Sequence, residues 1–229
     1  SKYSSMLAVL FIENHMIRNI IWSCLLSALC VSAFAQTVDE EWMKNAREYK
    51  AKYTDDEVLI LTSSEKYSFD ISKEEKNNPK VIVYQEVDEE YIALKDYVNV
   101  TFGDGYDSFS EIKRLSAEQN TGRNYRPMPL QVNDRAYNSE DMFDVDTRYK
   151  FLILPLNTIG LRVQGSYMKI YNDIRYLTSD HFVNRYPCLE KKIEIEIPDY
   201  LDLDIREFNF KGFNIIRINT VKGINARFG

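Results

Sequence analysis

The feature that most constrains the fold is a strict alternation of apolar and charged residues near the C-terminal end of the sequence. Three isoleucines alternate with two glutamates over residues 193–197, and Pro198 follows them. The apolar residues Leu201, Leu203 and Ile205 then alternate in the same way with two aspartates. A period of two places one side of a strand in a core and the other in water, which is typical of antiparallel sheets. We therefore expect antiparallel strands here, with Ile193, Ile195 and Ile197 facing the core.

Shorter β-branched and aromatic runs predict further strands along most of the chain. They are Val58 to Thr62, Tyr67 to Ile71, Val81 to Val87, Tyr91 to Leu94, Tyr97 to Phe102, Tyr149 to Leu154, Leu161 to Tyr171, Phe208 to Phe213 and Ile215 to Val221. The expected fold class is mainly β: an antiparallel β-sandwich-like domain, spanning residues 58–229, with an N-terminal helix.

The connections between these strands are less uniform. Lys73 to Lys80 is a solvated turn, and Gly103-Asp104-Gly105 is a strong turn signal. Pro155 and Gly160 predict a hairpin between the strands on either side of them. Ser108 to Gln119 fits either a strand or a short helix. Asn120 to Asp146 is either a long surface loop or an arm that pairs with the sheet.

A helix is expected from Thr37 to Tyr53. Thr37 and Glu40 have the spacing of a capping box, which satisfies free N–H groups of the first turn. Aromatic and small residues then recur at helical spacing on one face: Trp42, Ala46, Tyr49 and Tyr53. Residues 36–57 are therefore assigned to this helix and a linker.

The segment from Met16 predicts a secretory signal. Arg18 is followed by the apolar run Ile20 to Val31, and Ala33 and Ala35 occupy the small positions before a cleavage site at Gln36. Residues 1–35 would then be upstream sequence plus a signal peptide. A membrane-spanning helix and a lipid anchor at Cys30 are the alternatives. The favoured interpretation predicts export to the periplasm or cell envelope of a Gram-negative bacterium, without stable membrane insertion after cleavage.

Composition narrows the class of function. The chain has 29 basic and 35 acidic residues, a net charge of -6, so a nucleic-acid partner is not expected. It is 45% hydrophobic and 28% charged, which is typical of a folded globular protein. Signal cleavage would remove two of its three cysteines and leave only Cys188, so no intrachain disulfide is expected.

The candidate chemical groups are few. Cys188 and His181 could form a nucleophilic pair, but Cys188 leads into a strand rather than opening a helix, so a structural thiol is favoured. Asp141, Asp144 and Asp146 could hold calcium, but they lack the glycine turn and terminal glutamate of an EF-hand loop. Solvated loop charges are favoured. No catalytic, cofactor-binding or metal residue, and no cofactor, is assigned.

Tyrosine is the commonest aromatic residue, at 16 of 30. Exposed tyrosines can stack on sugars or bind proteins, whereas tyrosines in strands pack on a half-buried pleated surface. Since most of them lie in expected strands, packing is favoured.

From about Tyr53 to Phe213 the sequence resembles an exported bacterial domain of unknown function. The resemblance rests on Asp56-Glu57-Val58, on Gly103-Asp104-Gly105 and on Pro155 to Tyr167. It rests further on Phe182, Pro187, Ile195-Glu196-Ile197-Pro198 and Glu207-Phe208-Asn209.

That domain usually precedes a transglutaminase-like (papain-fold) domain, and its fold is β-rich. The sequence stops at Gly229, before such a catalytic domain, so the resemblance implies a chain truncated at its C-terminal end and carries over no catalytic residue. The leading hypothesis is a non-catalytic accessory module that positions substrate or binds a protein or peptide, with the downstream domain as a partner. The alternative is a module that binds a glycan or the cell envelope.

Overall fold

A computed structural model describes residues 40–72, 79–122, 124–136, 146–177, 184–204 and 206. All of them belong to one compact unit, residues 40–229. The expected Phe208 to Phe213 and Ile215 to Val221 strands, Thr37 of the capping box and the signal segment lie outside the described residues. Within the described part of the chain, no helix is long and apolar enough to cross a membrane.

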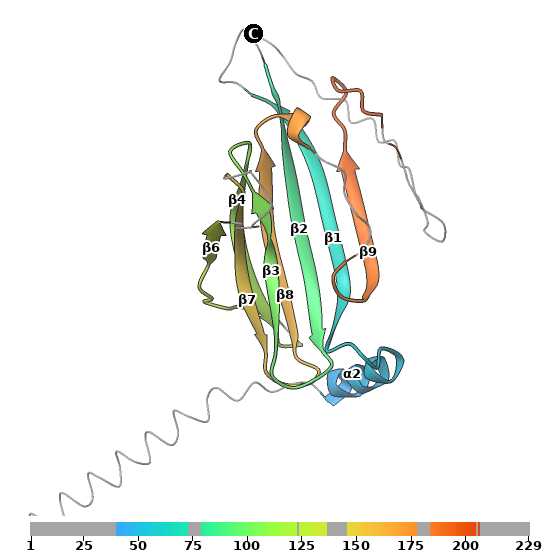
Figure 1. The fold of residues 1–229 in the computed structure, drawn as a ribbon. Helices are drawn as coiled ribbons and strands as arrows, with labels where there is room; N and C mark the ends of the chain where they lie inside the picture. Colours follow the sequence, from blue (N-terminus) through green and yellow to red (C-terminus); the bar gives the residue numbers. More distant parts are fainter. Residues whose placement is uncertain are drawn as a thin grey trace, which may run out of the picture. The chain divides into compact units, whose positions relative to one another are not determined.

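Two sheets and one α-helix make up the described fold (Figure 1). The six-stranded sheet has the order β5-β4-β8-β2-β1-β9, and the three-stranded sheet has the order β3-β7-β6. The bounds are α2 Glu40–Lys52, β1 Val58–Ile71, β2 Val81–Ala93, β3 Val98–Tyr106, β4 Ser110–Asn120, β5 Tyr125–Pro127, β6 Asn133–Ala136, β7 Arg148–Leu156, β8 Arg162–Tyr171, the 3-10 helix η2 Ile174–Tyr176 and β9 Cys188–Glu196. The expected fold class, a mainly β, sandwich-like domain with an N-terminal helix, is confirmed.

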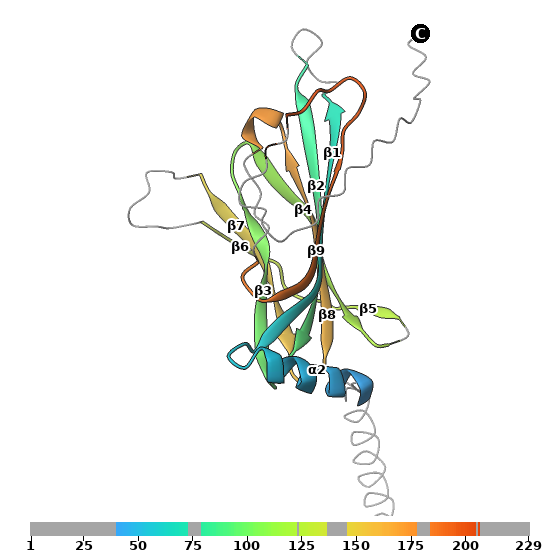
Figure 2. The same cartoon turned by 90° about the vertical axis from the view of Figure 1, so that its right-hand side faces the viewer.

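The smaller sheet lies against part of one face of the larger sheet, here called the inner face (Figure 2). Side chains from both sheets interdigitate there. A Cβ atom built on Gly165 of β8 would lie 2.5 Å from the ring of Phe102 on β3, so these two strands approach closely only because position 165 has no side chain. The core between the sheets is formed by fully buried aliphatic residues, among them Val100, Leu154 and Val163.

Helix α2 covers one end of the larger sheet. The expected face is confirmed: Ala46 is fully buried against Leu59, Ile92 and Leu94, and the half-buried Tyr49 and Tyr53 pack beside it. The guanidinium of Arg162 lies over the Trp42 ring, 4.4 Å from the ring centroid. The helix ends where Lys50 Nζ donates to the backbone oxygens of Thr54 and Asp56.

In two places, a pair of strands expected from the sequence forms one continuous long strand. β1 joins Val58 to Thr62 with Tyr67 to Ile71, and β2 joins Val81 to Val87 with Tyr91 to Leu94 up to Ala93. The polar residues between the runs suggested breaks. Ser63 and Glu65 are instead buried on the inner face, where tertiary hydrogen bonds satisfy them.

Gly103-Asp104-Gly105 is not a turn, which corrects the expectation from its sequence. The three residues continue β3, which pairs with β7 as far as Tyr106. Gly103 has φ +153°, and a Cβ there would lie 2.1 Å from the backbone oxygen of Lys150. This glycine therefore allows close approach of two strands rather than a reversal of the chain.

The expected hairpin between residues 149–154 and 161–171 is also wrong. β7 pairs with β3 and β6, whereas β8 pairs with β2 and β4 in the other sheet. Pro155 remains within β7, and Gly160, with φ +83°, lies against the backbone of Met43 in α2. The connection therefore crosses from one sheet to the other, and the helix packs against it.

The ambiguous segments resolve into strands. Ser108 to Gln119 contains β4, paired with β8. The described part of Asn120 to Asp146 contains two short pairing strands: β5 extends the larger sheet beside β4, and β6 extends the smaller sheet beside β7. Residues 123 and 137–145 lie outside the described ranges. Of the expected Lys73 to Lys80 turn, residues 73–78 lie outside the described ranges.

The alternating isoleucine segment is a strand, but its direction and burial differ from the expectation. β9 pairs with β1 in parallel and is an edge strand of the larger sheet. Ile193 is half-buried against the cluster of Tyr67, Val83 and Tyr171, whereas Ile195 is 37% exposed and Ile197 lies beyond the strand. The alternating residues 201–204 form no strand. Alternation correctly predicts that the strand has two different faces. It does not predict burial, because the inner face of an edge strand is only partly covered by the rest of the protein.

Candidate functional site

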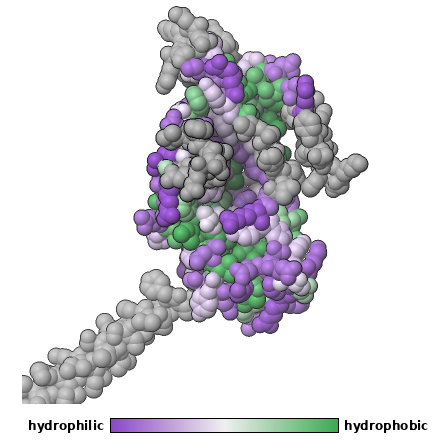
Figure 3. All heavy atoms as spheres, viewed as in Figure 1, coloured by the Kyte–Doolittle hydropathy of each residue, from purple (hydrophilic) through white to green (hydrophobic). Residues whose placement is uncertain are grey.

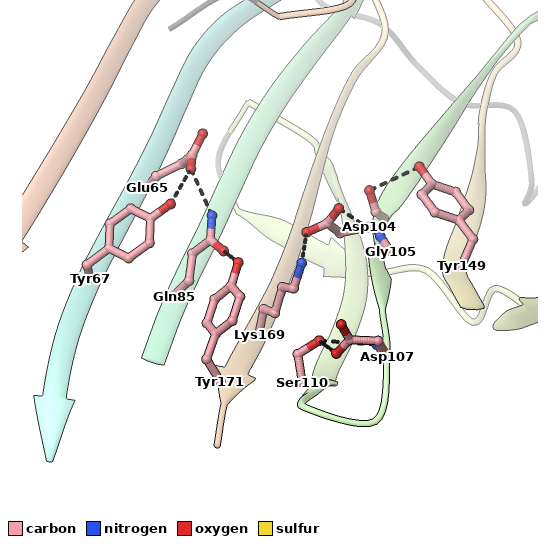
Figure 4. A network of polar contacts seen from close by, with 11 residues as sticks. Glu65, Tyr67, Gln85, Asp104, Gly105, Asp107, Ser110, Tyr149, Lys169 and Tyr171 are labelled. Carbon is pink, nitrogen blue, oxygen red and sulfur yellow. Dashed lines mark hydrogen bonds and ion pairs between the residues drawn. The ribbon is translucent and has the colours of Figure 1, made fainter. Parts of the chain in front are cut away.

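A polar network crosses the inner face toward the end of the sheet opposite α2 (Figure 4). Lys191 Nζ of β9 lies 2.6 Å from Glu65 Oε1 of β1, and both side chains are at most 9% exposed. Gln85 Nε2 of β2 donates to Glu65 Oε2 at 2.9 Å, and Tyr171 OH of β8 donates to Gln85 Oε1 at 3.1 Å. Four neighbouring strands of the larger sheet are therefore joined by side-chain contacts at one level.

A second ion pair connects the two sheets where this network ends. Lys169 Nζ of β8 donates to Asp104 Oδ2 of β3 at 2.9 Å, and the Lys169 side chain is only 13% exposed (Figure 4). The same ammonium lies 5.0 Å from the ring centroid of Tyr171. Burial is the largest influence and lowers the pKa of Lys169, but the charge and hydrogen bond of Asp104, together with Tyr171, raise that pKa above its ordinary value. Lys169 is therefore a fixed positive charge at neutral pH.

A pocket of about 220 Å³, here called the end pocket, opens beside this ion pair. Its lining comes from the ends of β3 and β8, the β3–β4 turn, the start of β4, the residue before β7, and η2. The lining residues are Asp104, Gly105, Tyr106, Asp107, Ser110, Thr147, Lys169, Tyr171 and Tyr176. Its volume can hold several water-sized groups. Polar groups converge on it from both sheets, as in sites that orient a small ligand.

The β3–β4 turn supplies one wall of the end pocket. Asp107 Oδ1 accepts hydrogen bonds from Ser110 Oγ at 2.8 Å and from the Phe109 backbone N–H at 2.9 Å (Figure 4). Such side-chain bonds to the backbone two residues on are typical of aspartate in tight turns. Ser110 is buried, so its hydroxyl is held in one place.

An aromatic pair forms the rim of the end pocket. Tyr176 of η2 stacks on Phe109 of the β3–β4 turn, with ring centroids 3.9 Å apart and planes 14° apart. Both rings are exposed, by 37% and 43%. The Asn172 N–H donates to the Phe109 backbone oxygen at 2.9 Å, which joins the two turns directly.

The start of η2 is fixed by a capping aspartate. The Asp173 side chain accepts from the Arg175 backbone N–H at 3.0 Å and from the Arg175 guanidinium at 2.6 Å. Bonds from the Arg175 side chain, and then from its backbone, lower the pKa of Asp173. The rim carrying Tyr176 is therefore ordered by a charged cap at one side and by the ring stack at the other.

Of the residues considered for chemistry from the sequence, Cys188 and Asp146 are described, and neither lines the end pocket. Cys188 is the first residue of β9; its Sγ donates to the Glu190 backbone oxygen at 3.2 Å, and burial raises the pKa of the thiol. Asp146 is exposed. His181, Asp141 and Asp144 lie outside the described residues. Across the described ranges, no cluster of three or more His, Cys, Asp or Glu residues is arranged to hold a metal ion.

No sequence motif marked Lys169, Ser110 or Tyr176 as functional residues. The sequence did contain one signal for Lys169. Every second residue of β8 points to the same face, so Lys169 lies on the inward face together with Val163 and Tyr171. A lysine at an inward position indicates a buried partner. Its partner Asp104 was assigned to a turn, which hid the contact.

Comparison with known proteins adds no family. No protein-family model matches the sequence, and no curated protein does. A solved structure described as a candidate nutrient binding protein from Legionella pneumophila aligns with a TM-score of 0.30 and 7% sequence identity. The alignment covers 50% of this chain and 40% of that protein. Similarity at this level carries no argument about this chain.

Proposed function

We propose that the chain is a non-catalytic, exported β-module that binds a small polar group of its ligand in the end pocket. The observation that carries this proposal is the pocket itself: about 220 Å³, lined from two sheets by an ion pair, a buried hydroxyl and tyrosines. A concave site with a few convergent polar groups is the ordinary form of a small-ligand site.

The state of the polar groups favours binding over catalysis. Burial lowers the pKa of Lys169, but Asp104 and Tyr171 together raise it above its ordinary value, so this amine stays protonated at neutral pH and does not serve as a base or nucleophile. The Asp107 carboxylate already accepts a hydrogen bond from the Ser110 hydroxyl. Both pairs present fixed hydrogen-bonding atoms, which suits orientation of a ligand.

An accessory role beside a transglutaminase-like domain is part of this proposal, and its support is the sequence resemblance. One of the motifs that carry the resemblance, Gly103-Asp104-Gly105, supplies two residues of the pocket lining, Asp104 and Gly105. In that role the end pocket would hold part of a protein or peptide substrate for the downstream domain.

A glycan or cell-envelope ligand is the second candidate. The observation that favours it is the aromatic composition of the pocket, which includes Tyr106, Tyr171 and Tyr176. On the face seen in Figure 3, hydrophobic residues occur in small separate groups among hydrophilic ones. A distribution of this kind on the coloured part of that face favours a small polar ligand over a broad apolar partner.

Amide chemical-shift mapping tests the pocket. The full chain is titrated with three kinds of probe: neutral methyl glycosides, acetylated dipeptide amides, and small carboxylic acids. We expect at least one kind to give saturable shifts that gather at Gly105, Ser110 and Thr147. Lys169→Met should weaken that binding about tenfold, since a charge-assisted hydrogen bond is lost.

The control for this experiment is Lys113→Met, which removes an exposed lysine ion-paired with Glu111 at 2.6 Å. It should leave the titration unchanged. Shifts that avoid the pocket with every probe, or equal weakening in both variants, would contradict the proposed site.

Export is tested separately. After expression in a Gram-negative host, N-terminal sequencing of the exported protein should begin at Gln36. A mature protein that keeps Trp22 would favour a membrane anchor instead.

A further inference from the structure

The rim of the end pocket is built to keep one aromatic ring in a fixed position. Phe109 covers one face of Tyr176 at 3.9 Å but is not part of the pocket lining. Tyr176 therefore both lines the pocket and stacks on Phe109. Stacked rings and the capped start of η2 fix the position of Tyr176 before any ligand arrives, which lowers the entropic cost of binding.

The walls offer both donors and acceptors within the reach of a single small ring. Lys169 is a donor, Asp104 and Asp107 are acceptors, the Thr147 hydroxyl can be either, and the Ser110 hydroxyl, which already donates to Asp107, can accept. A ligand that uses such a set must itself carry several groups that both donate and accept. Hydroxyl groups on a compact scaffold have this property, and amides or carboxylates have it only in part.

Charge in the end pocket disfavours ionic ligands. One lysine, Lys169, faces two aspartates, Asp104 and Asp107, so the charged lining residues carry a net -1. Arg148, Lys150 and Asp134 contact Tyr106 of the lining and bring the surrounding charge to zero, so an anion gains little. A cationic ligand gains little, because Asp104 is already paired with Lys169 and Asp107 already accepts two hydrogen bonds.

We infer that the end pocket takes an uncharged pyranose ring of a glycan, with an apolar C–H face of the sugar against Tyr176 and its hydroxyls toward Asp104, Ser110 and Lys169. This inference rests on the proposed binding function of the same pocket. Of the two ligand classes named there, it selects the glycan over the peptide and specifies the part of the glycan that enters the pocket. Stacking on Tyr176 provides apolar contact, and the paired polar groups select a neutral polyhydroxyl surface.

The test is a titration with sugars of one ring type and different charge. The full chain is titrated with the methyl glycosides of glucose, galactose, mannose and N-acetylglucosamine, then with glucuronic acid and glucosamine. We expect a neutral glycoside to bind with shifts at Gly105, Ser110 and Thr147. Glucuronic acid should bind at least about fivefold more weakly than that neutral sugar, because its carboxylate would lose hydration while the Lys169 ammonium is already paired with Asp104.

A variant pair isolates the stacking contact. Tyr176→Leu keeps apolar bulk beside Phe109 but removes the aromatic face, and we expect about fivefold weaker binding of the neutral glycoside. Tyr125→Ala is the control, because this tyrosine of β5 is exposed to a similar extent, 44%, and lies outside the pocket lining. It should leave binding unchanged.

The outcomes separate the two proposals. If dipeptides or carboxylic acids shift the pocket amides and no neutral glycoside does, the binding function stands and the sugar inference is wrong. If Tyr176→Leu binds the neutral glycoside as tightly as the unchanged chain, the inference is also wrong. If no probe of any class shifts the pocket amides, both are wrong.

Discussion

The space between the two sheets differs sharply between its two ends. At the α2 end it is filled by aliphatic residues such as Leu154, Leu156 and Val163, all fully buried. Toward the end pocket the same inner face carries Glu65, Gln85 and Lys169, joined by hydrogen bonds and ion pairs. Apolar burial stabilises without directional demands, whereas buried charges stabilise only in one geometry. The difference indicates that one end holds the sheets together and the other keeps polar groups in fixed places.

The largest effect is expected from breaking the buried ion pair of the polar end. Lys191→Met removes the ammonium that lies 2.6 Å from Glu65 Oε1. Loss of one partner of a buried pair costs about 4 kcal/mol of unfolding free energy, to be measured by urea denaturation. Lys113→Met, at an exposed ion pair, should cost less than about 1 kcal/mol.

A double variant shows whether the charge or the packing matters. Lys191→Met combined with Glu65→Leu replaces the pair by apolar side chains, and should recover most of the loss. Equal stability of the Lys191→Met variant and the unchanged chain would show that the polar network does not order this end.

A somewhat smaller loss is expected from a cavity at the apolar end. Leu154→Ala should lower the unfolding free energy by about 3 kcal/mol, since Leu154 is fully buried between the sheets. Ile153→Ala, on the exposed side of the same strand, is the matched control and should cost well under half as much. Similar losses for the two variants would contradict the inward face assigned to β7.

The edge strand β9 provides a weaker contrast. Ile193→Ala should cost about 1.5 kcal/mol and Ile195→Ala about 0.5 kcal/mol, because Ile193 packs on Tyr67 and Ile195 is 37% exposed. Thermal and urea unfolding of both variants would measure this. A larger loss for Ile195→Ala would mean that this edge is covered in solution.

The smallest effect concerns titration rather than stability. Burial raises the pKa of the Cys188 thiol. The Cys188 thiol therefore stays protonated as pH rises past its ordinary pKa of ~8.5. Iodoacetamide labelling of the native chain should be slower than in urea at every pH from 7 to 9, with the midpoint moved upward. Faster native labelling at pH 7 would indicate an activated thiol.

Much of the local structure could be predicted from patterns of a few residues. The face of α2 around Ala46, the strand character of residues 58–62, 67–71, 81–87 and 91–93, and the β-rich class all follow from periodicity and side-chain shape. Of the candidate site, the resemblance pointed to the segment with Asp104 and Gly105, but not to its role as a pocket wall. The Lys169–Asp104 contact joins residues 65 positions apart, and no local pattern specifies such a pair.

By itself, the sequence determined which segments bury one face: helical spacing in α2, and alternation in β8 and β9, are local consequences of backbone geometry. Only the tertiary structure decided which strands are neighbours. It separated β7 from β8, aligned β9 parallel to β1, and kept Gly103 inside a strand. Pairing depends on backbone hydrogen bonds and side-chain packing between residues far apart in the chain, and every strand has the same backbone groups to offer. The end pocket exists because that pairing brought β3, β4, β8 and η2 together.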